Sequence, residues 1–156
     1  MATFTANRGS FTPVAHATQA DNWVLTTLTV GNQAKVKIIT CGGRETTAVA
    51  YRTRWGRVNN TPATPTALTL SASNPNVAAL SSVNTYTTQA TLAADPTGLF
   101  SLDWLGNGGG LTLNLPIGGE WQVIGGALGT AFNQIACGNI AGAGASTTSY
   151  TIHFEE

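Results

Sequence analysis

Apolar and polar residues alternate along most of the chain. In residues 34–40, for example, Lys35 and Lys37 are expected on one face of a strand, with Val36 and Ile38 on the other. Helical spacing is almost absent, and a helical turn is expected only at 76–80. The alternation predicts about ten short strands, at residues 23–30, 34–40, 46–55, 67–70, 85–91, 99–104, 111–115, 120–124, 132–136 and 149–154.

Gly, Asn, Asp and Pro separate these segments, which recur about every 8 to 14 residues, as in all-β sandwiches and barrels. Gly31-Asn32 predicts a hairpin between the first two strands. Longer links at 56–66 and 71–84 favour a jelly roll over an up-and-down barrel. We therefore expect one domain over 1–156, an antiparallel jelly-roll-like sandwich of about 8–10 short strands. Residues 1–20 are either an extended arm that pairs with a neighbouring subunit or an ordinary edge strand.

The composition of the 156-residue chain is poor in charge. Only 9% of the residues are charged, against about 25% in an average soluble domain, and seven basic residues balance seven acidic ones. Such a chain has no bulk field to attract nucleic acid or an anionic membrane. A neutral, charge-poor surface is also poorly protected against self-association. We expect this surface to be covered by copies of the chain or by a larger assembly.

The few charges are segregated along the sequence. Residues 35–57 carry six basic side chains and one acidic one, a net charge of +5, and the rest of the chain carries −5. Opposite charges on different faces suit a ring, in which one face of each copy docks on another face of the next. A solvated basic face without a partner is the alternative. The residues expected to contact a partner are Lys37, Arg44, Arg52, Arg54 and Arg57, with Tyr51 and Trp55 on the reverse face of the strand.

The segment Gly118-Gly119-Glu120-Trp121 is the second expected contact, as a turn between subunits. Tryptophan and arginine are common at the centres of protein interfaces. For both Trp55 and Trp121, packing in the core is the alternative role. The predicted contact residues of this segment are Gly119, Glu120 and Trp121.

Residues for catalysis are scarce. His16 and His153 are the only histidines, and the chain has no Gly-x-Ser-x-Gly elbow. It also has no Cys-x-x-Cys or His-x-x-x-His spacing for a metal. Asp103 and Glu120 each precede a tryptophan, as in sugar sites, but adjacent strand residues point to opposite faces. We expect no catalytic residue, no metal site, no cofactor and no small-molecule ligand, and therefore no enzyme.

Cysteine content and the apolar segments bear on the compartment. Cys41 and Cys137 are too few for a disulfide framework, and we expect two small buried side chains or at most one bridge. The first residues lack a basic segment followed by an apolar run, so no secretory signal is expected. The most apolar stretch, 121–145, is interrupted by Gly125-Gly126 and by polar residues. Synthesis in a host cytoplasm without membrane association is expected.

Four segments together resemble small structural proteins of tailed bacteriophages. They are Met-Ala-Thr-Phe-Thr-Ala-Asn-Arg-Gly-Ser-Phe-Thr-Pro at 1–13, Ala-Tyr-Arg-Thr-Arg-Trp at 50–55, Gly-Leu-Phe-Ser-Leu-Asp-Trp at 98–104 and the glycine-rich 118–131. Such proteins include the capsid decoration, or cement, proteins. That resemblance implies a β-rich fold, frequently a jelly roll, commonly trimeric and bridging major capsid proteins on the outer shell.

The expected function is therefore non-catalytic. The chain would cement the capsid surface of a virion as a homotrimer, with the major capsid protein lattice and its own copies as partners. Nucleic acid is not an expected partner, because five surplus charges without stacked aromatic side chains make a weak footprint. The alternative is a carbohydrate-binding or adaptor module of a phage tail or neck.

Overall fold

The structure is a computed structural model, and it describes residues 1–11, 20–27, 32–43, 50–57, 65–86, 98–105, 110–124, 134–141 and 148–156. These residues form strands, turns and extended segments, and none of them is helical. All strand pairs are antiparallel. The prediction of an all-β, antiparallel fold is confirmed.

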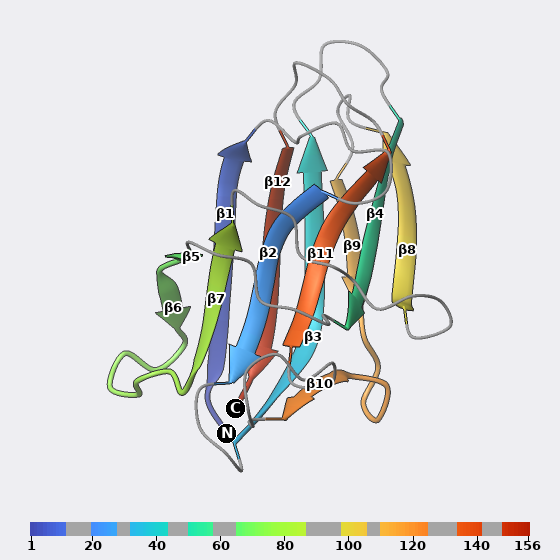
Figure 1. The fold of residues 1–156 in the computed structure, drawn as a ribbon. Helices are drawn as coiled ribbons and strands as arrows, with labels where there is room; N and C mark the ends of the chain where they lie inside the picture. Colours follow the sequence, from blue (N-terminus) through green and yellow to red (C-terminus); the bar gives the residue numbers. More distant parts are fainter. Residues whose placement is uncertain are drawn as a thin grey trace.

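The strands assemble into two six-stranded sheets, which Figure 1 shows as stacked layers with both termini at the lower end. In sheet A the order is β10-β3-β12-β1-β6, and β9 also pairs with β3. In sheet B the order is β5-β7-β2-β11-β4-β8. Sheet A consists of β1 (Thr3–Phe11), β3 (Gln33–Gly43), β6 (Leu70–Ala72), β9 (Gly110–Asn114), β10 (Trp121–Ile124) and β12 (Thr148–Glu155). Sheet B consists of β2 (Ala20–Thr27), β4 (Ala50–Arg57), β5 (Pro65–Ala67), β7 (Ser81–Tyr86), β8 (Gly98–Leu105) and β11 (Gln134–Ala141).

Among the described residues, one apolar cluster fills the space between the sheets. Sheet A contributes stacked rings of Phe4 and Phe154, whose centroids lie 5.7 Å apart. Sheet B contributes Trp55, whose ring meets Tyr150 edge-on at 6.3 Å. Burying each large side chain stabilises the fold by about 1.5–3 kcal/mol relative to exposure. The other buried apolar residues are Ala6, Leu25, Ala34, Val36, Ile39, Cys41, Val83, Val123, Ile135 and Ile152.

The first four strands alternate between the sheets, because β1 and β3 lie in sheet A and β2 and β4 in sheet B. The predicted hairpin across Gly31-Asn32 is therefore wrong: β2 pairs with β7 and β11, and β3 pairs with β9, β10 and β12. Both strands bury an apolar face, but from opposite layers. Alternation of this kind agrees with a jelly roll. That finer assignment stays a prediction, because most links between the sheets lie outside the described residues.

A β-bulge at Lys37 changes which residues of β3 enter the core. Val36 lies opposite Phe154 and Ile38 opposite His153, so Lys37 has no partner residue in β12. An extra residue shifts the inside–outside alternation by one position. Ile39 is consequently buried and Ile38 only half-buried. The expectation that Ile38 shares the buried face of Val36 is wrong for this reason.

Three further expectations differ from the structure. The predicted link 71–84 contains the end of β6 and most of β7, a polar strand that its pairing with β2 and the burial of Val83 hold in place. The expected helical turn at 76–80 is absent from these described residues: a turn lies just before it, over 74–77, where Val77 N–H donates to the Asn74 carbonyl (3.1 Å). Residues 3–11 of the proposed arm form β1, between β12 and β6 of the same chain, and residues 12–19 lie outside the described part.

Candidate functional site

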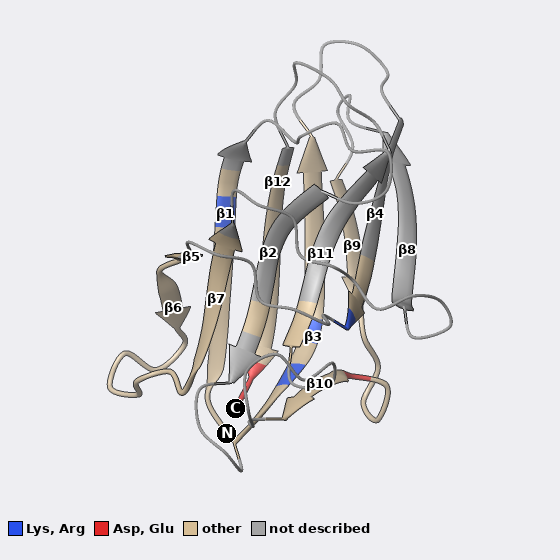
Figure 2. Cartoon of the chain, viewed as in Figure 1, with Lys and Arg blue, Asp and Glu red and all other residues tan. Residues whose placement is uncertain are grey.

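The two segments predicted to contact partners meet at one end of the sandwich, around β10. Figure 2 shows basic residues at the lower ends of β3 and β4, and acidic residues just before β10 and at the end of β12. Lys37 bonds to Glu120, Trp55 packs against Trp121, and Arg57 reaches the strand that Trp121 begins. We call this region the β10 site: Lys37, Arg57, the turn 116–120, Trp121, Gln122 and Glu155.

A tight turn at Pro116–Gly119 projects from the β10 site. Gly119 N–H donates to the Pro116 carbonyl at 2.9 Å, and Gly118 has a φ of +85°. A positive φ at the third position is the mark of a type II turn, where glycine avoids a steric penalty. Ile117 occupies the second position and is 97% exposed. The turn therefore presents an aliphatic side chain to solvent on a constrained backbone.

An ion-pair cluster fixes this turn to sheet A. The Lys37 ammonium lies 2.7 Å from Glu120 Oε1 and 3.0 Å from Glu155 Oε2. The second oxygen of Glu120 accepts the Gly118 N–H at 2.7 Å. At the N-terminal end of the segment 115–120, Leu115 N–H donates to the Lys37 carbonyl at 2.8 Å. Lys37 thus holds both ends of the segment 115–120, and its side chain is free to do so because the bulge removes it from the regular ladder.

The same contacts shift two pKa values in opposite directions. The hydrogen bond from Lys37, with help from backbone N–H groups, lowers the pKa of Glu120 from 4.5 to about 2. The bonds to Glu120 and Glu155 raise the pKa of Lys37 above 10.5. Both groups are therefore charged across the neutral range. The positive charge of Lys37 is balanced within the chain, and little of it remains for a partner.

Arg57 is directed differently from the sequence expectation. Alternation along β4 gives Arg57 the parity of the buried Trp55. Its Nη1 donates across the sandwich to the Gln122 carbonyl in sheet A. Burial lowers the pKa of its guanidinium. Arg57 therefore ties the two sheets together rather than extending an outer basic face.

The two tryptophans of the predicted contacts differ in exposure. Trp55 is fully buried, so it packs in the core and presents no surface to a partner. Trp121 is half-buried, and its ring centroid lies 6.1 Å from that of Trp55. Gly119 is confined by the turn, because a Cβ there would lie 3.0 Å from Pro116 Cγ. Of the second segment, Glu120 and Gly119 thus build the turn, and Trp121 anchors it to the core.

The remaining predicted contacts are placed only in part. Arg44 lies outside the described residues. The backbone of β4 places Tyr51 opposite Trp104, Arg52 opposite Asp103 and Arg54 opposite Ser101 in the register with β8. Their side chains lie outside the described part of the structure. The role of this strand as a contact surface stays a prediction.

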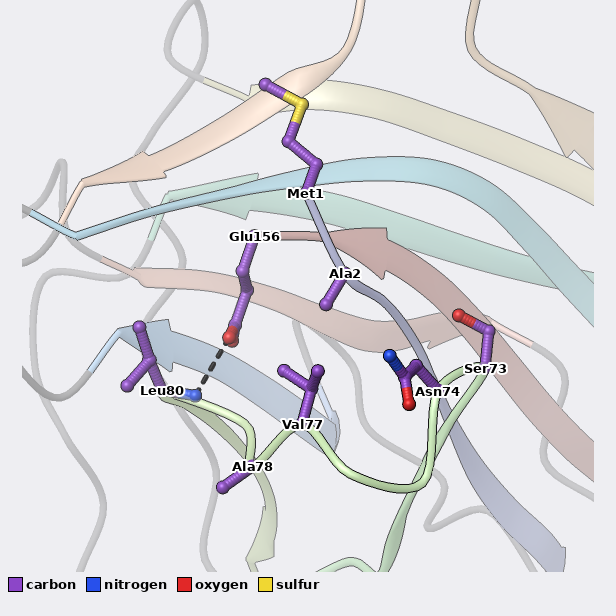
Figure 3. Close-up of a pocket in the computed structure, with 8 residues that line it drawn as sticks. All are labelled: Met1, Ala2, Ser73, Asn74, Val77, Ala78, Leu80 and Glu156. Atoms are coloured by element: carbon purple, nitrogen blue, oxygen red, sulfur yellow. Dashed lines mark hydrogen bonds between the residues drawn. The ribbon is translucent and has the colours of Figure 1, made fainter.

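A shallow groove of about 340 Å³ lies beside the termini and was not anticipated from the sequence. Figure 3 shows Val77 pointing toward Ala2, and the Glu156 side chain reaching the backbone of Leu80. Ala78 also lines the groove, but its methyl group points away from both. The carboxylate of Glu156 accepts the backbone N–H groups of Leu80 (2.8 Å) and Ser81 (2.7 Å). The rest of the groove lining is mainly apolar. Its other lining residues are Met1, Ser73 and Asn74.

Few reactive groups lie in the described part of the chain. Cys41 is a free, buried thiol, and burial raises its pKa to about 12, which suppresses the reactive thiolate. His153 Nδ1 shares a 2.9 Å hydrogen bond with Thr5 Oγ1 on the outer face of sheet A. Among the described residues, no three His, Cys, Asp or Glu side chains are grouped to hold a metal. The same residues include no helix long and apolar enough to span a membrane.

Sequence reasoning selected Lys37, Glu120 and Trp121 but missed Ile117 and Glu155. A signal for the turn was present, since Pro-Ile-Gly-Gly places glycine where a type II turn needs it. Nothing local could have linked Glu155 to Lys37, because the cluster depends on β12 lying beside β3. Comparisons with protein-family models, with curated proteins and with solved structures found no match to this chain.

Proposed function

We propose that the chain is a non-catalytic structural protein of a virion, which decorates the capsid shell as a homotrimer and contacts neighbouring subunits through the β10 site. The resemblance of four segments to structural proteins of tailed phages motivates the class of protein. The low charge of the chain supports a surface that other subunits cover.

The observation that carries the proposal is the presentation of Ile117. An isolated exposed apolar residue is ordinary on a protein surface. Ile117 differs because its turn is held by the Gly119–Pro116 hydrogen bond and by the Glu120–Lys37 ion pair. Little conformational entropy is then lost when a partner buries the side chain. A pre-ordered apolar anchor of this kind suits a contact that forms many times in a lattice.

The ion pairs of Lys37 at the base of the turn support the same role. Lys37 faces two carboxylates, so burial of the turn does not leave an unpaired cation. The contact would therefore depend mainly on the apolar tip. This modifies the expectation from the sequence, in which the basic residues themselves grip the partner.

Infection with a virus that encodes variants of the chain tests the proposal. The wild-type chain should be recovered in intact particles, and Ile117→Asp should reduce its occupancy because a charge replaces the anchor. Val77→Asp is the matched control, since Val77 is also exposed but lies at the groove beside the termini. Equal occupancy of all three proteins would exclude the turn as the contact. Absence of the wild-type chain from particles would exclude the virion role itself.

A further inference from the structure

The strand β10 forms an edge of sheet A among the described residues. It pairs with β3 through Trp121–Val36, Gln122–Lys35, Val123–Ala34 and Ile124–Gln33, and it begins the strand order of the sheet. An edge strand presents backbone N–H and C=O groups that can pair with another chain. Which groups of β10 point outward can be worked out from the register of the neighbouring strands.

The outward groups of β10 belong to Gln122 and Ile124. Ala2 and Glu156 exchange both backbone hydrogen bonds (3.0 Å each), so the backbone N–H and C=O of Glu156 point toward β1. The backbone N–H and C=O groups of successive residues point to opposite neighbouring strands. Those of Glu155 therefore point toward β3, where Glu155 pairs with Lys35. The backbone groups of Lys35 therefore point to β12 and away from β10. The N–H and C=O of the residue opposite, Gln122, consequently point away from β3, and those of Ile124 follow by alternation.

Arg57 occupies one of these outward groups. Its guanidinium Nη1 donates to the carbonyl oxygen of Gln122, although Arg57 belongs to the other sheet. The side chain of Gln122 is exposed, and Ile124 is 46% exposed. The edge is thus accessible, and its central acceptor is covered from within the same chain.

We propose that Arg57 is an edge guard, which prevents the β10 edge from pairing with the β10 edge of a second copy. An antiparallel pair of identical strands is self-complementary about a two-fold axis. With Gln122 of one copy opposite Ile124 of the other, each pair exchanges two backbone hydrogen bonds. The guanidinium of Arg57 takes the acceptor of one of those bonds and stands where the second strand would lie. This role of Arg57 does not depend on the proposed contact with a virion shell.

The variant Arg57→Met tests the guard, because it keeps an unbranched apolar stem and removes the donors. We expect its mass by light scattering to rise with protein concentration to at least twice the wild-type mass. Adding Gln122→Pro should restore the wild-type mass, since proline removes an outward N–H without affecting the ladder to β3. Lys35→Met is the matched control: it removes the same charge from the neighbouring strand and should leave the mass unchanged.

Any of three results with these variants would overturn the proposal. Arg57→Met could remain at the wild-type mass at every concentration while its circular dichroism stays native. Its association could persist after Gln122→Pro, or Lys35→Met could associate equally. If Arg57→Met does not fold, amide exchange of the wild-type protein decides: the Gln122 amide should exchange faster than those of Trp121 and Val123. Protection of Gln122 equal to theirs contradicts the outward geometry on which the guard depends.

Discussion

Lys37 and Glu120 lie 83 residues apart in the sequence, and their side chains form a 2.7 Å ion pair. The pair joins a β-bulge in β3 to a turn that no strand pairing restrains. One oxygen of Glu120 bonds to the lysine and the other to the Gly118 N–H, so the carboxylate holds the backbone of the turn as well as its base. The position of Ile117 thus depends on a contact between two distant parts of the chain.

Replacing Glu120 should change how stability depends on pH. Its pKa falls from 4.5 to about 2 on folding, so its stabilising contribution is complete above pH 4.5 and is lost as the pH falls toward 2. The raised pKa of Lys37 gives a contribution that is complete below pH 10.5 and is lost above it. Glu120→Gln should therefore flatten both limbs, measured as unfolding free energy in urea from pH 2 to pH 11. Identical pH profiles for the two proteins would show that the ion pair does not form in solution.

The bulge at Lys37 predicts unequal roles for two adjacent isoleucines. Ile39 is fully buried and Ile38 is half-buried. Ile39→Ala should lower the unfolding free energy by about 2–5 kcal/mol. Ile38→Ala should cost less than about 1 kcal/mol, as outward-facing positions usually do. Urea denaturation of both variants measures the difference. The reverse ranking would mean that β3 follows uninterrupted alternation without a bulge.

The turn predicts a penalty for a side chain at Gly118. A non-glycine residue at its φ of +85° costs about 1–2 kcal/mol, although nothing within 4 Å would touch the new methyl group. Gly9→Ala is the matched control, because its surroundings are equally open and its φ is not positive. Thermal unfolding should show a lower midpoint for Gly118→Ala and no loss for Gly9→Ala. Equal midpoints would argue against the left-handed conformation.

Local sequence patterns predicted where the strands lie better than they predicted which strands pair with one another. Alternation separated Val36 from Lys35, and Val36 is buried, because period two follows from strand geometry itself. For Trp55 the sequence left a partner contact and core packing open, and the structure shows core packing. The Gly31-Asn32 signal was ambiguous, since a reversal within one sheet and a crossing between sheets use the same residue types. The burial of Ile39 in place of Ile38 depends on a bulge that only the neighbouring strands define.

In the candidate site, too, the sequence identified single residues but not the contacts between them. Lys37 and Glu120 were selected from separate segments for separate reasons, and folding brings them together through the pairing of β10 with β3. Arg57 was selected for its charge, but its parity with Trp55 directs it across the sandwich to Gln122. Ile117 was passed over because an apolar residue carries no signal of exposure until the turn around it is built.

The solution mass of the purified wild-type chain tests the central claim most directly. A homotrimer predicts about 48 kDa by light scattering, three times the chain mass of 16.1 kDa, and the value should hold over a wide range of protein concentration. Ile117→Asp should shift the mass toward that of a single chain while the circular dichroism stays native. A wild-type mass near 16.1 kDa at every concentration contradicts the trimer and the role of the β10 site in forming it.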